Sequence, residues 1–332
     1  MAEMVVAVGY TEQQANPERK NREKVINDFS VIRTDEKETS NGTRKDKNNE
    51  RKKAKRNPSG RCFTHGFHLV KGKMNHEMED YVVAETRRMK GAELGLYAIF
   101  DGHSGRAVPK YLESHLFDNI LDEPGFLMDM KSAIRRAFGI TDDEVLERVG
   151  GRRGGSTAVT AILINGEKLV VANVGDSRAV LCKKGVAKQL SVDHEPQKEK
   201  DAIESKGGFV SKKRGNVPRV DGQLAMSRAF GDGSLKEHIT SEPDIIIETI
   251  GMDVEFIILA SDGLWKEVIC PSKCFLGNII KINAFVQVIS NQEAVDCIRD
   301  MNDSQEAAEQ LIEEALSRNS RDDISCIVVS FL

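Results

Sequence analysis

The feature that most constrains the fold is a series of short apolar, β-branched runs separated by turn residues. The runs lie at 156–164, 168–174, 178–184 and 186–191. Each has the length and composition of a β-strand. Asn165-Gly166, between the first two, is the strongest short-range hairpin signal. Together they predict a four-stranded antiparallel meander.

Elsewhere, groups of strands alternate with helical blocks. Strand character recurs at 81–85, 94–100, 244–249, 255–260 and 324–332. Apolar spacing and helix stop signals predict helices at 104–121, 197–206, 291–301 and 304–319. Ser290 and Glu293 have the spacing of a capping box before the third helix. Separate strand and helix groups favour an α+β layered domain over alternating βαβ units.

Acidic residues stand at the ends of four apolar strands. Two strands run into an Asp-Gly pair, at Asp101-Gly102 and Asp262-Gly263. Glu79 and Asp80 precede another strand, and Asp322-Asp323 precede the last one. Because a sheet can hold several strand ends rigidly together, we expect these acids to converge.

Converging carboxylates would repel one another, and each would gain a raised pKa unless a cation neutralised the group. Oxygen ligands select Mg²⁺, Mn²⁺ or Ca²⁺ over zinc. The glycine that follows each aspartate permits a tight bend and can expose a carbonyl as a further ligand. The alternative interpretation is that Asp-Gly is turn chemistry alone, but four acidic strand ends favour a metal site.

The charge is divided unevenly along the chain. Residues 11–60 contain 14 Lys and Arg against 9 Asp and Glu, whereas residues 61–332 contain 34 against 42. We expect residues 1–60 to be a basic, mostly disordered tail. The cluster at 51–56 is either a nuclear import or electrostatic contact element, or a solvated stretch. The acidic body argues against a nucleic-acid partner.

The composition favours a reducing compartment. Six cysteines are scattered along a chain whose start lacks the pattern of a secretory leader. Cys270 and Cys274 have no further Cys or His at similar spacing, which argues against a zinc site. No apolar run approaches the roughly 20 residues of a membrane span. We expect a cytoplasmic or nuclear protein that acts as a monomer and has no membrane partner.

Eight segments occur in the order found in the type 2C metal-dependent protein phosphatases, and the chain resembles the small plant members. They are KGKMNHEMED at 71–80, YAIFDGHSG at 97–105, GGSTAVT at 154–160, VANVGDSRAV at 171–180, DHEP at 193–196, DGQLAMSRAFGD at 221–232, SDGLW at 261–265 and RDDISCIVV at 321–329. The resemblance covers residues 61–332 and implies a four-layer α-β-β-α sandwich with two central antiparallel β-sheets.

The resemblance also implies residue roles at a centre of two Mn²⁺ or Mg²⁺ ions. Asp101 would bridge the ions, with the Gly102 carbonyl on one of them. The implied remaining ligands are Asp262, Asp322, Glu79, Asp80 and, for a weaker third ion, Asp176. His103 would be the general acid and Lys73 the group nearest the substrate phosphate. The implied activity is hydrolysis of phosphoserine and phosphothreonine in proteins by a metal-activated water.

Three departures from the family pattern bear on this reading. The family commonly has a phosphate-binding arginine before the Met-Glu-Asp segment; here Lys73 is the nearest basic residue, at a different spacing, and lysine lacks the bidentate fork. Lys266 replaces an acid that supports the third ion in many relatives, which argues against that ion here. The segment 267–287 is an apolar insert of 21 residues, 12 of them apolar, which begins close to Asp262.

Two interpretations other than an active phosphatase remain. The insert favours a weakly active or inactive phosphatase-fold protein that binds phosphoproteins, whereas the complete set of acids favours the active enzyme. A nucleic-acid-binding protein led by the basic tail is the third interpretation, but no aromatic stacking motif supports it.

Overall fold

The computed structural model describes residues 61–149, 153–213, 217–265, 267–271 and 283–332. The predictions for the tail at 1–60, its basic cluster at 51–56, Lys266 and Cys274 lie outside these residues. Among the described residues, no helix is both long enough and apolar enough to cross a bilayer.

The larger sheet has seven strands. Its order is β11-β4-β3-β5-β6-β12, and β2 pairs with β3 beside this path. The strands are β2 (Asp80–Met89), β3 (Ala92–His103), β4 (Gly155–Ser156), β5 (Ala158–Ile164), β6 (Lys168–Val174), β11 (Phe230–Gly231) and β12 (Asp244–Thr249). β5 is buried at every position, as its uninterrupted apolar sequence predicts for a strand covered on both faces.

The smaller sheet has five strands in the order β1-β16-β13-β7-β8. They are β1 (Phe63–Val70), β7 (Arg178–Lys183), β8 (Val186–Gln189), β13 (Val254–Ala260) and β16 (Ile324–Phe331). All pairings between neighbouring strands of this sheet are antiparallel.

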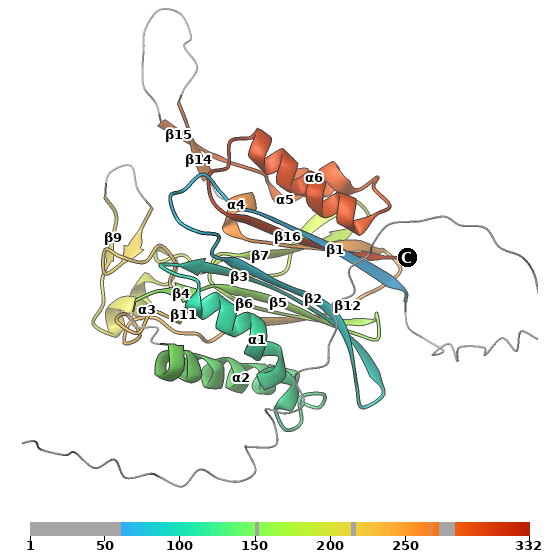
Figure 1. Cartoon of the computed structure of the whole chain (residues 1–332), viewed down its shortest axis with the longest axis horizontal. Helices are drawn as coiled ribbons and strands as arrows, with labels where there is room; N and C mark the ends of the chain where they lie inside the picture. The colour runs from blue at the N-terminus through green and yellow to red at the C-terminus, as the bar shows by residue number, and fades with distance from the viewer. Residues whose placement is uncertain (1–60, 150–152, 214–216, 266, 272–282) are drawn as a thin grey trace, which may run out of the picture. The chain divides into compact units, whose positions relative to one another are not determined.

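Helices cover the outer face of each sheet, so the layers run α-β-β-α (Figure 1). On the seven-stranded sheet lie α1 (Ala107–Asp122), α2 (Met130–Glu144) and the following π-helical turn (Val145–Val149). On the five-stranded sheet lie α4 (Asp262–Trp265), α5 (Asn291–Ile298) and α6 (Ser304–Ser317). A third apolar core, which includes Tyr97, Ile99, Leu259 and Ile327, lies between the sheets. The expected four-layer α+β sandwich is therefore confirmed.

Local chemistry fixes the helix starts. The predicted capping box is present before α5: the Ser290 hydroxyl accepts from the Glu293 N–H, and the Glu293 carboxylate accepts from the Ser290 N–H. Asp303 caps α6 by accepting from the N–H groups of Gln305 and Glu306. Such caps satisfy backbone donors that a helix leaves unpaired at its first turn.

A small subdomain is formed within residues 198–241, where, among the described positions, only β11 belongs to the seven-stranded sheet and Phe230 to its apolar core. It contains α3 (Lys200–Ser205) and the two-stranded pair of β9 (Val210–Ser211) and β10 (Arg219–Val220). Its own apolar cluster consists of Ile203, Val220, Leu224, Met226, Ala229, Leu235 and Ile239.

The predicted four-stranded meander at 156–191 is wrong. Its first two strands are β5 and β6 of the seven-stranded sheet, whereas the last two are β7 and β8 of the five-stranded sheet. Gly175-Asp176-Ser177 is therefore a crossover between sheets and not a hairpin turn. The strands at 244–249 and 254–260, which the sequence joins around Gly251, likewise belong to different sheets.

The segment predicted as an insert begins and ends in strands. β14 (Glu267–Pro271) pairs antiparallel with β15 (Asn283–Gln287) as a two-stranded ribbon outside both large sheets. The residues between these two strands lie outside the described part of the chain.

Candidate functional site

Two acidic residues meet through the register of neighbouring strands. β2 and β3 pair antiparallel so that Asp80 lies opposite Asp101. β3 does not end at position 100, as the sequence predicts, but continues through Gly102 and His103 to pair with β4. Asp101 therefore lies within a hydrogen-bonded strand, which fixes its backbone.

The other two strand-end acids come from the five-stranded sheet. β13 ends at Ala260, two residues before Asp262, and β16 begins at Ile324, two residues after Asp322. β13 and β16 are hydrogen-bonded neighbours, with Ala260 opposite Cys326. Their registered ends carry the two aspartates to the same edge of the sheet.

The carboxylates of both sheets influence one another electrostatically. Burial raises the pKa of Asp101 well above its usual range, and the negative charges of neighbouring aspartates raise it further. Those neighbours are Asp80, Asp262, Asp176 and Asp322. Because charges act over short distances inside a protein, these five aspartates, of the six acids predicted as ligands, share one region of the structure.

Asp80 is buried in the same region. Burial raises its pKa to about 7, hydrogen bonds from the Ser325 and Ser261 hydroxyls oppose the shift, and the charges of Asp323 and Asp262 add to it. The Ser325 Oγ lies 2.5 Å from Asp80 Oδ2. The other carboxylate oxygen, Oδ1, is buried and has no hydrogen-bond partner.

These residues fit a hard divalent cation by the chemistry of their donors. A buried anionic oxygen without a hydrogen-bond partner, beside further carboxylates, is satisfied by a cation more readily than by a neutral group. Within the described ranges, no three His, Cys, Asp or Glu side chains are arranged as a preformed coordination shell. The region therefore contains several carboxylates close together. Backbone carbonyls and waters would have to complete the coordination shell of a bound cation.

Glu79 and Gly102 lock the start of β2 to the end of β3. The Gly102 N–H donates to the Glu79 carbonyl at 3.2 Å, and the Glu79 carboxylate accepts from the Gly105 N–H at 2.7 Å. A Cβ at position 102 would lie 2.6 Å from the Glu79 carbonyl oxygen, so the close approach requires glycine.

Asp323 takes a different role from its neighbour Asp322. Its carboxylate accepts from the Gly72 N–H at 2.7 Å and from the Glu79 N–H at 2.8 Å. It thereby fastens the loop at 71–79 to the start of β16.

Lys73 lies on that loop and is exposed. Its N–H donates to the Arg321 carbonyl at 2.8 Å, which places its backbone next to the segment that carries Asp322. The structure thus brings Lys73 to the rim of the acidic region.

His103 pairs with a carboxylate that the sequence reasoning missed. Its Nε2 lies 2.7 Å from Asp232 Oδ2, while its Nδ1 is buried without a hydrogen-bond partner. Asp232 is buried and adopts a left-handed backbone with φ of 49°. The segment 221–232 contains this residue, but nothing in the spacing connects positions 129 apart.

Asp176 lies on the crossover between the two sheets. Next to it, the Ser177 hydroxyl lies 2.9 Å from Thr157 Oγ1, which accepts from the Asp101 N–H at 3.1 Å. Two hydrogen bonds thus connect the Asp176 turn to the backbone of Asp101.

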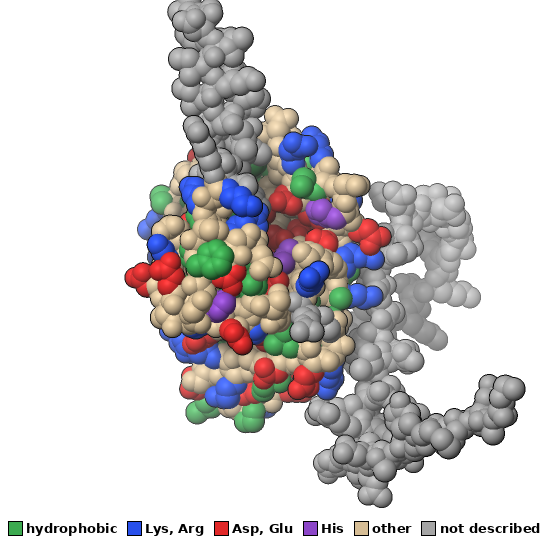
Figure 2. All heavy atoms as spheres, turned by 90° about the vertical axis from the view of Figure 1, so that its left-hand side faces the viewer, with side chains coloured by type: hydrophobic (Ala, Val, Ile, Leu, Met, Phe, Trp, Pro, Cys, Tyr) green, Lys and Arg blue, Asp and Glu red, His purple; other side chains and the backbone are tan. Residues whose placement is uncertain are grey.

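One face of the molecule shows this arrangement from outside. Figure 2 shows Asp and Glu side chains gathered in a hollow, with His side chains nearby and Lys and Arg side chains around it. A hollow of negative charge edged by positive charge suits a cation site that receives an anionic substrate.

Comparison with known proteins identifies a matching family. Residues 63–270 match the family model described as protein phosphatase 2C. Among curated proteins, probable protein phosphatase 2C 28 of Arabidopsis thaliana is 59% identical over 273 residues, which cover 82% of this chain and 74% of that protein. Probable protein phosphatase 2C 62 of Oryza sativa subsp. japonica is 58% identical over 284 residues, covering 84% and 91% respectively.

Solved structures agree on the fold. The crystal structure of serine-threonine phosphatase 2C from Toxoplasma gondii superposes with a TM-score of 0.65 at 22% identity, covering 81% of this chain and 95% of that one. A C. elegans sex determining protein superposes with a TM-score of 0.66 at 23% identity, covering 82% and 65% respectively.

Proposed function

This chain belongs to the protein phosphatase 2C family and is a protein serine/threonine phosphatase, and we propose that it hydrolyses phosphoserine and phosphothreonine at a centre of two divalent cations, Mn²⁺ or Mg²⁺. The observation that carries the proposal is the meeting of acids at one edge: Asp80 lies opposite Asp101 in the β2–β3 register, and Asp80 Oδ1 is buried without a hydrogen-bond partner. The charges of Asp262, Asp176 and Asp322 also act on Asp101 and help to raise its pKa. So much buried negative charge is stabilised when cations are bound.

The residues that would hold the ions come from both sheets. Asp101 is central, because its carboxylate is influenced by acids of both sheets, and the carbonyl of Gly102 follows it. Asp262 and Asp322 would supply the ligands from the five-stranded sheet. Two residues at the start of β2, Glu79 and Asp80, would hold ions directly or through water.

When bound, the two cations supply a deprotonated water at neutral pH and offset negative charge on the phosphoryl group. The chain's own contribution is to keep the carboxylates fixed on paired strands, which avoids reorganisation during the reaction. Lys73, exposed at the rim, would attract the substrate phosphate as a point charge.

His103 would hold the proton that the seryl or threonyl oxygen requires as it leaves. Its Nε2 lies 2.7 Å from Asp232 Oδ2, whereas its Nδ1 is buried. Asp232 would fix the orientation of the imidazole and stabilise its protonated form, as carboxylates do beside histidines in acid–base catalysis.

Hydrolysis of a phosphothreonine peptide tests the proposal. Full-length protein stripped with a chelator should release no phosphate, and added Mn²⁺ should restore the activity. Equal rates with and without chelator would contradict a metal-dependent mechanism.

The β14–β15 ribbon supports a second candidate function, that of a phosphoprotein-binding protein with weak activity. It begins at Glu267, five residues after Asp262, so a strained ribbon could displace a ligand by about 1 Å and reduce activity about 100-fold. The protein would then bind phosphoproteins while hydrolysing them slowly. Removal of residues 267–287 tests this: a large gain in rate favours the second candidate, and an unchanged rate dismisses it.

A further inference from the structure

A buried histidine outside the proposed catalytic set holds the turn that carries Asp176. His194 has 2% of its surface exposed. Its Nδ1 lies 3.0 Å from the Gly175 N–H, and its own N–H donates to the Gly175 carbonyl at 3.0 Å. Its Nε2 lies 3.0 Å from Asp244 Oδ2.

These partners determine the tautomer of His194. A backbone N–H can only donate, so Nδ1 must be the acceptor, and the ring proton lies on Nε2, where it is donated to Asp244. Burial lowers the pKa of His194, and the positive charge of Arg228 lowers it further. A neutral ring with a fixed tautomer is a rigid link between Gly175 and Asp244.

The turn reaches the proposed metal site through buried hydroxyls. Ser177 Oγ lies 2.9 Å from Thr157 Oγ1, and Thr157 makes two hydrogen bonds with the backbone of Asp101. Gly175 has φ of 101°, and a Cβ there would lie 2.6 Å from Thr157 Cγ2. The turn therefore packs closely against Thr157. A displacement of Gly175 would move Thr157 and, through its two hydrogen bonds, the backbone of Asp101.

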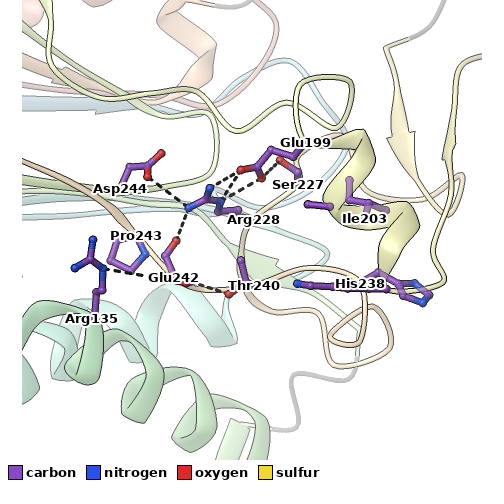
Figure 3. A pocket seen from close by; sticks show the side chains of 12 residues that line it. Arg135, Glu199, Ile203, Ser227, Arg228, His238, Thr240, Glu242, Pro243 and Asp244 are labelled. Carbon is purple, nitrogen blue, oxygen red and sulfur yellow. Dashed lines mark hydrogen bonds and ion pairs between the residues drawn. The ribbon is translucent and has the colours of Figure 1, made fainter. Parts of the chain in front are cut away.

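Ion pairs hold Asp244, the residue that His194 contacts through Nε2. Arg228 pairs with Glu199 and with Asp244, the latter at 3.7 Å, and donates to the Glu242 carbonyl (Figure 3). Ser227 donates to Glu199 through its hydroxyl and to the His194 carbonyl through its N–H. Arg228 also lines a cavity of about 230 Å³, whereas His194 is enclosed.

We propose that His194 is a positioning residue for the metal centre: through the Gly175–Ser177 turn it sets the placement of Asp176 and, through Thr157, that of Asp101. The inference rests on the proposed function, because it concerns the binding of the ions. Outer partners that orient metal ligands typically change metal affinity about 10- to 100-fold when they are removed.

Two amide substitutions separate the two ends of the ring. In His194→Asn the side-chain oxygen takes the place of Nδ1 and can still accept from Gly175. In His194→Gln the amide nitrogen takes the place of Nε2 and can still donate to Asp244, but the bond to Gly175 is lost. The pair is matched, since both variants bury an amide at one position.

The experiment is calorimetric titration of metal-free full-length protein with Mn²⁺, combined with thermal unfolding of the same samples. We expect His194→Gln to bind Mn²⁺ about 10-fold or more weakly than wild type, and His194→Asn to remain within about 3-fold. Affinity unchanged in His194→Gln, or equal losses in both variants, would overturn the proposal, because a general packing role would not distinguish the two nitrogens.

A second variant keeps the test decisive if His194→Gln does not fold. Ser177→Ala removes only the hydroxyl that reaches Thr157, and it should weaken Mn²⁺ binding in the same direction; unchanged binding would overturn the proposal. Wild-type protein that binds no Mn²⁺ and hydrolyses no phosphopeptide would instead contradict the proposed function.

Discussion

The sandwich edge that carries the acids and the small subdomain at 198–241 differ in how they are held. Asp101 lies within a twelve-residue strand, β3, and Asp262 and Asp322 adjoin the long strands β13 and β16. The small subdomain has two-residue strands and a separate apolar cluster, tied to the rest partly by the ion pair of Arg228 with Asp244 and its hydrogen bond to the Glu242 carbonyl. Groups that must be fixed to within a fraction of an ångström thus stand on extended sheet, and a less extensively bonded unit stands beside them.

The largest expected effect comes from the sandwich edge. Asp101→Asn removes the central charge, and we expect phosphopeptide hydrolysis to fall about 10³-fold, the equivalent of about 4 kcal/mol of lost transition-state stabilisation. Steady-state phosphate release with saturating Mn²⁺ measures this. Asp221→Asn, in the small subdomain, is the control and should retain most of the activity. Similar losses in both variants would remove the distinction between the two regions.

A smaller effect is expected at Asp232, which directly follows β11. Asp232→Asn should slow hydrolysis of a phosphoserine peptide about 10²-fold, since orientation of His103 supports proton donation to the leaving oxygen. An aryl phosphate, whose leaving group needs no proton, should be affected much less. His103→Ala should show the same substrate dependence. Equal losses on both substrates would assign Asp232 a purely structural role.

Substitution of two buried isoleucines would compare the stability of the sandwich with that of the small subdomain. Ile257 packs between the sheets and Ile203 in the small cluster, and both are nearly inaccessible. Ile257→Ala should lower the free energy of global unfolding by about 2–5 kcal/mol. Ile203→Ala should instead open the subdomain locally, which amide hydrogen exchange at 198–241 would detect. Equal global destabilisation would show that the two regions unfold as one unit.

The smallest effect concerns the pH dependence of the metal-free protein. Burial raises the pKa of Asp80 from its usual 3.8 to about 7. The folded state therefore binds more protons than the unfolded chain between these values, and Asp80 destabilises the fold increasingly as pH rises through this window.

Asp80→Asn removes that destabilisation. We expect it to melt several degrees higher than wild type at pH 8, by about 2–4 °C for each kcal/mol of stability regained in a domain of this size. At pH 5, where the carboxyl is largely protonated in the folded state but still ionised in the unfolded chain, the difference should be smaller than at pH 8. A variant that melts lower than wild type at pH 8 would contradict the raised pKa.

The sequence predicts the strand-end acids well because each signal is local. An apolar run followed by Asp-Gly marks where Asp101 and Asp262 stand, and caps such as Ser290 mark helix starts. The meander at 156–191 was mispredicted for the same reason: the turn at Gly175 has the same local chemistry whether the chain folds back or crosses to another sheet.

Residues that act through distant contacts could not be found this way. Asp232 meets His103 across 129 positions, and Thr157 meets Asp101 across 56. His194 meets Gly175 across 19 positions. Such contacts follow from topology, and no spacing in the chain encodes them.

The most direct test of the central claim, that acids from two sheets hold a pair of hard cations, is electron paramagnetic resonance of metal-free protein titrated with Mn²⁺. If Asp101 and its neighbouring aspartates hold two ions, the signal of a spin-coupled pair should appear as two equivalents are added, and in Asp101→Asn the signal of isolated ions should replace it. An uncoupled signal at every stoichiometry in the wild-type protein would contradict the account.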